Sequence, residues 1–168
     1  MEDKSIPLRK DVPEALTWNL QDIYESDEAW LREYEALKTL PEELAAYKGR
    51  LGESAGTLLS FLRLEDEADL RLGKLMGYAN CKSDQDTSDG FYQDLRGKAV
   101  ASIVAVSGAA AFAAPEIMAL DEDTLNLFYI AQPGLETYRR SLYRIRRRAA
   151  HILSPAEERL LAAAGEMA

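Results

Sequence analysis

The sequence predicts an all-α protein, a helical bundle of antiparallel helices with an irregular N-terminal arm. Apolar residues recur at intervals of three and four along most of the 168 residues, which is the spacing of one helix face. No segment shows the strict alternation of a half-buried strand, and no glycine-rich phosphate loop is present. Hydrophobic residues make up 47% of the chain, which is enough for a core in a protein of this size.

The arm is expected over residues 1–25, and the helical domain over residues 26–168. Proline opposes regular helix within the arm. The apolar side chains expected to anchor the arm are Trp18, Leu20 and Ile23. The first helix is expected after Ser26, because serine is a favoured N-cap and two acidic residues follow it in the first turn.

The helices of the first half are indicated by their apolar faces and their ends. One face of the first helix carries Trp30, Tyr34 and Leu37. Pro41 suits the start of a second short helix, and Gly49 stands where a C-cap glycine belongs. Ser54 opens a short apolar helix, and a long helix follows it to about Ser83. The stripe of the long helix is formed by Leu64, Ala68, Leu72, Leu75 and Ala79.

A polar connection over residues 84–89 leads to the most apolar helix, which is expected to end before Pro115. Small side chains crowd its second half and would allow close helix packing. We therefore expect residues 99–112 to form a central helix that is mostly buried. The nearly uncharged stretch over residues 99–114 is shorter than the ~20 residues that span a bilayer, so no membrane segment is predicted.

The last helices follow a break at Gln132-Pro133-Gly134. In the helix over residues 135–148, the side chains expected to face the core are Tyr138, Leu142 and Ile145. Ser154 then opens a capping box, with proline at the first helical position. The helical pattern still runs at Ala168, and we expect the chain to be the front of a longer protein.

Charge and cysteine content exclude several classes of protein. The net charge of −9 and the pI of 4.7 argue against a general affinity for nucleic acid or anionic lipid. A single cysteine, Cys81, excludes a disulfide scaffold, and a single histidine also excludes a four-ligand zinc site of Cys and His. The first residues contain no apolar signal-peptide core, which with the lone thiol predicts a cytoplasmic location.

Two stretches resemble metal motifs at first sight. His151 is not part of a His-Glu-x-x-His motif, so a structural role is favoured for it. Asp84–Gly90 resembles the start of a calcium loop, but Asp89 stands where glycine is needed and Leu95 stands where a bidentate glutamate is needed. A turn between two helices is the better interpretation. Cys81 has no histidine near it in sequence and is interpreted as a bystander thiol.

Charged clusters are the remaining candidates. Six arginines lie within ten residues, and they are Arg139, Arg140, Arg144, Arg146, Arg147 and Arg148. They could bind nucleic acid, pair with the acidic remainder of the chain or contact another domain. A solvated helix face and an N-cap are expected for two acidic runs, Glu65-Asp66-Glu67 with Asp69, and Asp121-Glu122-Asp123. The residues therefore predict no catalytic and no metal site, and they identify no substrate-binding residue.

The order and spacing of several stretches carry a family resemblance. These stretches are Val12–Glu14, Thr17–Tyr24, Ser26–Trp30, Tyr47–Ser54, Tyr78–Ala79, Asp86–Thr87 and His151–Glu158. Along nearly the whole chain, the series resembles the N-terminal region of oligoendopeptidase F, in the thimet-oligopeptidase-like group of zinc metallopeptidases, family M3.

The resemblance implies a cytoplasmic, largely helical enzyme that cleaves short peptides inside a deep channel. Its zinc would be held by His-Glu-x-x-His and a later glutamate, all downstream of the matched region. This chain is then expected to hold no cofactor, to be inactive alone and to continue into a catalytic domain as its partner.

In that reading it forms part of the channel wall around an oligopeptide substrate, with no nucleic acid and no membrane as partner. Two alternatives stay open. One is a free-standing helical interaction module, and the other is a nucleic-acid binder that uses the Arg139–Arg148 helix.

Overall fold

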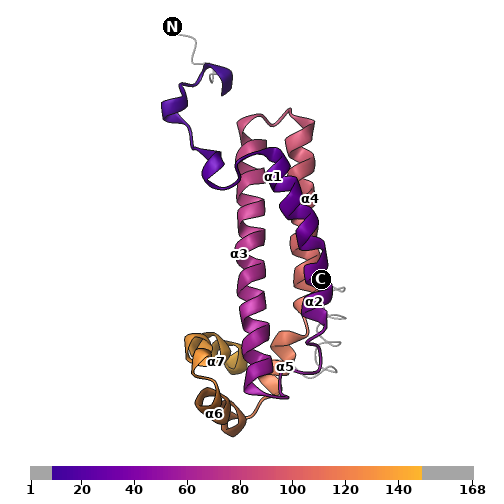
Figure 1. Cartoon of the computed structure of the whole chain (residues 1–168), viewed down its shortest axis with the longest axis vertical. Helices are drawn as coiled ribbons and strands as arrows, with labels where there is room; N and C mark the ends of the chain where they lie inside the picture. Colours follow the sequence, from indigo (N-terminus) through magenta and orange to yellow (C-terminus); the bar gives the residue numbers. More distant parts are fainter. Residues whose placement is uncertain (1–8, 149–168) are drawn as a thin grey trace, which may run out of the picture. The chain divides into compact units, whose positions relative to one another are not determined.

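The computed structural model describes residues 9–148, and all regular structure in this part of the chain is helical (Figure 1). The predicted all-α fold class is therefore confirmed. The α-helices are α1 Asp27–Ala36, α2 Leu40–Ala45, α3 Ala55–Gln85, α4 Gly90–Ala110, α5 Ala113–Ala119, α6 Glu122–Ala131 and α7 Arg139–Arg147. The predictions for His151 and for the capping box at Ser154 lie outside the described residues.

The chain divides into two compact units. The first contains the described residues up to Ala46 together with Arg63–Ala110, and the second contains Tyr47–Leu62 and the described residues from Ala111 onward. Helix α3 begins in the second unit and continues into the first. The expected division into an arm and one helical domain stays a prediction.

The N-terminal arm consists of three 3-10 helices, η1 Arg9–Asp11, η2 Glu14–Leu16 and η3 Leu20–Asp22. Leu20 is buried and Ile23 is half-buried, as expected of anchors. Trp18 was expected to be a third anchor, and this is wrong, because its side chain is 86% exposed. It lies on the extended link between η2 and η3, in the wall of an open hollow rather than in the packed core.

Helix α1 starts and docks as its sequence predicts. The Ser26 hydroxyl accepts a hydrogen bond from the Ala29 amide at 3.2 Å, which caps the first turn. Trp30 is fully buried, and its indole Nε1 donates to the Leu75 carbonyl oxygen at 2.8 Å. The Tyr34 ring stacks on Trp30 with 5.7 Å between centroids. One apolar face therefore fixes α1 against α3.

Helices α3 and α4 form an antiparallel hairpin in the first unit (Figure 1). Its turn closes on Asp86, whose Oδ1 accepts bonds from the Ser88 amide at 2.9 Å and the Ser88 hydroxyl at 2.6 Å. Across the hairpin, Gln93 Nε2 donates to the buried Ser83 hydroxyl at 2.8 Å. Helix α2 packs against α4 and buries Leu40 and Leu44.

One continuous helix replaces the two that were expected after Ser54. The serine caps α3 as predicted, with the Thr57 amide donating to its hydroxyl at 3.0 Å. The helix then runs through to Gln85 without interruption. No proline lies within it and its glycines are spaced apart, so the backbone hydrogen bonds can continue across the expected boundary.

The prediction that residues 99–112 are mostly buried is wrong. Ala99 and Val106 are buried, but the opposite face of α4 is exposed, and Val104 on that face is 66% exposed. Apolar composition indicated burial, but the first unit covers only one side of the helix. By length and composition alone, Gly90–Ala119 is the one helical stretch in residues 9–148 that could cross a membrane, because an 18-residue window within it has a mean hydropathy of 1.7.

The second unit is held together by a loop, an aromatic cluster and short helices. Gly49 has φ +79°, the left-handed conformation of a C-cap glycine, as its position predicts. Glu116 of α5 accepts bonds from the Gly49 amide at 2.5 Å and the Leu51 amide at 3.2 Å. The centroid of the Phe61 ring lies 5.7 Å from the ring centroid of Tyr47 and 5.6 Å from that of Phe112. The carboxylate thus ties the loop before α3 to α5.

The last segment begins as a 3-10 helix rather than an α-helix. Pro133–Tyr138 forms η5, and α7 starts only at Arg139. Leu142 is fully buried, whereas Tyr138 and Ile145 are half-buried, so the predicted core face is present across the end of η5 and α7. Helix α7 packs against α5.

Candidate functional site

The predicted absence of catalytic and metal residues is not contradicted by the described side chains. Within residues 9–148, no three His, Cys, Asp or Glu side chains lie close enough together to hold a metal ion. Cys81 is an exposed free thiol on α3. His151 lies outside this range, so the absence of a metal site in the whole chain stays a prediction.

The stretch that resembles a calcium loop is the turn of the α3–α4 hairpin. Asp86 and Asp89 direct their side chains to amides of the same turn, with Asp89 Oδ1 accepting from the Phe91 amide at 2.9 Å. Hydrogen bonds from Ser88 lower the pKa of Asp86. The carboxylates therefore close the turn, as the sequence interpretation favoured.

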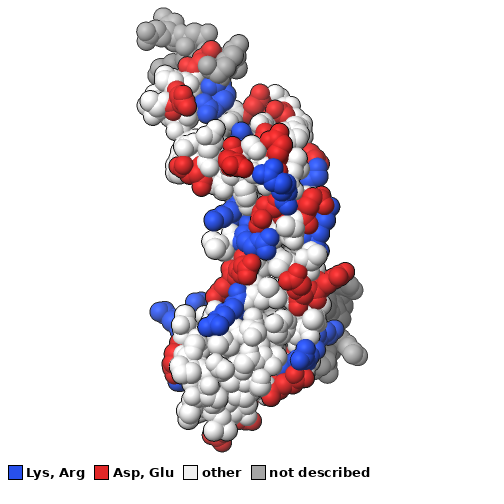
Figure 2. Space-filling model, viewed as in Figure 1, with Lys and Arg blue, Asp and Glu red and all other residues white. Residues whose placement is uncertain are grey.

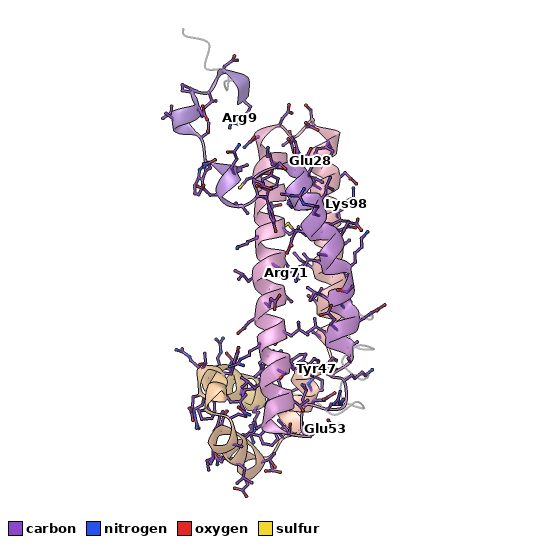
Figure 3. All side chains as sticks on the ribbon, viewed as in Figure 1. Arg9, Glu28, Tyr47, Glu53, Arg71 and Lys98 are labelled. Atoms are coloured by element: carbon purple, nitrogen blue, oxygen red, sulfur yellow. The ribbon has the colours of Figure 1, made fainter. Side chains whose placement is uncertain are left out.

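The acidic runs are also explained by local structure. On α3, Glu65 is half-buried, and burial followed by the charges of Asp69 and Asp66 raises its pKa. Arg71, labelled on α3 in Figure 3, pairs with the exposed Glu67. Its Nε also lies 2.7 Å from Glu33 Oε1 of α1. The second run begins with an N-cap, because Asp121 accepts from the Thr124 amide at 2.6 Å.

A polar cluster of Asp27, Tyr78, Tyr92 and Lys82 joins α1, α3 and α4. The Tyr78 hydroxyl donates to Asp27 Oδ1 at 2.7 Å, and the Tyr92 hydroxyl donates to Oδ2 at 3.1 Å. Lys82 Nζ lies 3.9 Å from Oδ1. Burial first, and then the bond to Asp27, raises the pKa of both tyrosines. Each phenol therefore stays a neutral donor.

This cluster lies beside a hollow of about 750 Å³ in the first unit, which residues of the arm also line. Asp27, Tyr78 and Lys82 contribute to its wall. Because both oxygens of Asp27 accept hydrogen bonds, the carboxylate is not placed to act as a general base. The cluster therefore holds helices together. Sequence reasoning missed it, since its members lie 51 and 65 positions apart and no local pattern connects them.

The arginine helix lines a groove of about 440 Å³ in the second unit, between α6, η5 and α7. Arg139 donates to both oxygens of Glu136, at 2.7 and 2.6 Å, and its guanidinium lies 3.9 Å from the Tyr129 ring centroid. The bond from Arg139 lowers the pKa of Glu136. This pair is local, which agrees with the interpretation that the arginines meet carboxylates of their own chain.

The other five arginines behave differently. Among residues 9–148, none of them makes an ion pair within 4 Å, and Arg140, Arg144, Arg147 and Arg148 are exposed. Arg144, Arg147 and Arg148 line a further hollow with Ile145. Arg144, Arg147 and Arg148 therefore form a basic surface on α7 within the described residues.

The uncovered face of α4 is the other surface that the structure reveals. Its residues are Gly97, Val100, Ala101, Val104 and Gly108, here called the outer α4 seam. Charged side chains are interspersed over the first unit in the view of Figure 2, whereas the sequence of α4 is uncharged from Ala99 onward. Apolar residues on both faces of α4 were the available signal, and it was interpreted as burial within the bundle.

Comparisons with known proteins agree on one family. A family model described as Oligopeptidase F matches residues 116–168. Oligopeptidase PepF of Bacillus subtilis is 41% identical over 162 residues, which cover 96% of this chain and 24% of that protein. The plasmid-encoded oligoendopeptidase F of Lactococcus lactis subsp. cremoris is 36% identical over 162 residues, covering 95% and 27%.

Solved structures extend the likeness to the fold. The crystal structure of oligoendopeptidase-F from Enterococcus faecium matches with a TM-score of 0.68 at 32% identity, covering 84% of this chain and 28% of that one. A Chlamydophila abortus protein at 22% identity shares the fold, with a TM-score of 0.79 over 95% of this chain.

The chain spans about a quarter of the length of the curated relatives it matches, and the region it matches is N-terminal. The resemblance seen in the sequence is thus confirmed by named relatives over nearly all of its residues. We conclude that the chain is similar, over nearly all of its residues, to the N-terminal quarter of proteins named oligoendopeptidase F and oligopeptidase PepF.

Proposed function

We propose that the chain is the non-catalytic helical portion of a cytoplasmic, zinc-dependent oligoendopeptidase that hydrolyses peptide bonds in short peptides. The observation that carries the proposal is the match to relatives named oligopeptidase and oligoendopeptidase over 95–96% of this chain. About three quarters of those relatives lie beyond the match, which leaves room for a catalytic domain.

The zinc of the proposed enzyme does not fit the described residues of this chain. Residues 9–148 contain no cluster of three His, Cys, Asp or Glu side chains that could hold a metal ion. We therefore assign no catalytic step to this chain. The metal and its ligands belong to the part of the protein that follows.

The proposed role of the chain is to form part of the wall of the substrate channel. A wall needs extended elements with surfaces free to meet a neighbouring domain. The α3–α4 hairpin is a long helical element, and α4 and α7 each carry a surface uncovered within the described residues. Neither nucleic acid nor a membrane is part of this proposal, because the net charge is −9.

A chimera tests the proposal. This chain replaces the matched N-terminal quarter of Bacillus subtilis oligopeptidase PepF, and cleavage of a fluorogenic oligopeptide is measured with and without a zinc chelator. We expect peptidase activity that the chelator abolishes. A chimera that folds and binds zinc but cleaves nothing, beside an active parent enzyme, would show that the chain does not supply this function.

A further inference from the structure

The outer α4 seam runs along the helix on the side opposite its packed residues. Leu95, Ala99 and Val106 face the first unit and are buried, whereas Val100 is 45% and Val104 is 66% exposed. A Cβ added to Gly97 or Gly108 would meet no described atom within 4 Å. The helix therefore presents an open face that is flat at both glycines.

The composition of this face differs from that of a solvated helix. No charged residue occurs between Ala99 and Ala114, although a helix that faces water on one side normally carries charges there. Gly97, Ala101, Val104 and Gly108 follow at spacings of four, three and four, with Val100 beside Ala101. Small residues at such spacings let a second helix approach closely.

The exposed face of α3 provides the contrast. Leu70 is 61% exposed, close to the value for Val104, but its neighbours one turn away include Asp66, Glu67 and Lys74. Leu70 is a single apolar side chain on a charged surface, which is common and calls for no partner. The α4 seam is continuous and calls for one.

We propose that the outer α4 seam is the docking face for an apolar helix from the downstream part of a full-length oligoendopeptidase F. The inference rests on the proposed function, and it names the surface through which this portion meets the rest of the polypeptide. The chain corresponds to only 24–28% of its relatives, so most of the protein that could cover the seam lies outside it.

The size of the seam favours an occupant on the same polypeptide. At ~1.5 Å per residue it is about 17 Å long, which is only about three helical turns of contact for a second helix. Stable interfaces between separate chains bury roughly 1,200–2,000 Å². A tethered helix needs far less area, because its effective concentration is about millimolar or higher.

The other side of α4 argues against lipid as the occupant. Helices α2 and α1 pack against α4. A bilayer surrounds a spanning helix on all sides that protein does not cover, and it would have to accommodate the charged residues Asp94, Arg96 and Lys98 in the first turns.

Cysteine alkylation tests the proposal. Cys81 is first replaced by serine, and single cysteines are introduced as Val104→Cys on the seam and Leu70→Cys as the matched control. Each is measured in the 168-residue chain and in the chimera with Bacillus subtilis oligopeptidase PepF. We expect similar rates for both positions in the chain alone. In the chimera, Val104→Cys should react about 10-fold or more slowly, while Leu70→Cys changes less than about 2-fold.

The possible results of this experiment distinguish failure of the docking face from failure of the proposed function. Equal rates at both positions in a chimera that cleaves peptides would overturn the docking face and leave the proposed function standing. Protection of Val104→Cys in the chain alone would also overturn it. Light scattering then measures the mass of the chain in solution. A doubled mass would show that a second copy covers the seam, and an unchanged mass would assign the protection to residues 149–168.

Protection that requires phosphatidylcholine vesicles would assign the face to lipid and overturn the proposal as well. If Val104→Cys does not yield a folded chimera, Val100→Cys repeats the measurement on the same seam. A chimera that folds, has no activity and shows no protection at either position would overturn both proposals together.

Discussion

At the scale of single residues, Asp27 has the most consequential set of contacts in the first unit. It follows the N-cap of α1 and accepts hydrogen bonds from Tyr78 on α3 and Tyr92 on α4. A side chain that is 27% exposed thus joins three helices that are remote in sequence. Its loss would leave two tyrosine hydroxyls without their acceptor.

We expect Asp27→Ala to destabilise the chain by about 1–3 kcal/mol, the usual cost of leaving partly buried donors unpaired. Urea unfolding followed by circular dichroism measures the change. Asp69→Ala, on the exposed face of α3, is the control and should change stability by less than about 0.5 kcal/mol. Equal effects of the two variants would show that the cluster contributes nothing beyond a surface charge.

Tyr24 makes stability sensitive to alkaline pH. Burial first, and then the charge of Glu33, raises its pKa to about 12 from 10.0. The folded state therefore favours the neutral phenol, and this contribution is present below pH 10.0 and lost as the pH rises toward 12. We expect the fall in urea midpoint across this range to be smaller in Tyr24→Phe. In the exposed control Tyr143→Phe the fall should match that of the parent chain, and a matching fall in Tyr24→Phe would contradict the assignment.

At the scale of elements, helix starts are predictable from the sequence because a single side chain closes each first turn. Those that the structure confirms are Ser26, Ser54 and Asp121. Continuity was harder to predict. The break expected within α3 is absent. An apolar cluster followed by a charged stretch can change which side of a helix is buried. That change does not interrupt the backbone hydrogen bonds, so the helix continues.

Burial of α4 could not be predicted from its own residues. Apolar and small side chains indicate that a helix face is covered, but they do not say by which part of the protein. The first unit covers the face with Ala99 and leaves the face with Val104 to solvent. The sequence therefore predicted the helix and its apolar faces correctly. It did not predict that the face with Val104 is exposed to solvent.

Two substitutions on α4 make this difference measurable. Ala99 is fully buried, and we expect Ala99→Leu to overpack the first unit and lower stability by about 1–3 kcal/mol. Ala105 is exposed, and Ala105→Leu should change the stability of the isolated chain by less than about 0.5 kcal/mol. Thermal unfolding of the two variants decides the matter. A loss at Ala105 as large as that at Ala99 would mean that the second face is covered in the isolated chain.

At the scale of the whole molecule, the family resemblance could be predicted from the sequence, but catalytic residues could not. Short stretches in a fixed order were enough to identify oligoendopeptidase F, and named relatives confirm it. No catalytic residue could be named, because the resemblance places the metal motif outside the matched region. The candidate surfaces on α4 and α7 depend on which faces the fold leaves open, and that information is not local to any motif.

The isolated chain is expected to have neither tightly bound zinc nor peptidase activity. A zinc peptidase needs several ligands and a base, and the whole sequence has one histidine. Metal analysis after dialysis and a fluorogenic peptide assay measure the two properties, with Bacillus subtilis oligopeptidase PepF as the active reference. One zinc per chain together with turnover that a chelator stops would refute this prediction.

The two tryptophans should differ in their intrinsic fluorescence, because their environments differ. Trp30 is enclosed between α1 and α3, whereas Trp18 on the arm is almost wholly in water. Their fluorescence should therefore differ in colour and in access to a dissolved quencher such as acrylamide. In the Trp18→Phe variant, all tryptophan emission comes from Trp30 and therefore reports on the α1–α3 contact alone. It would report when that contact opens, without any added dye.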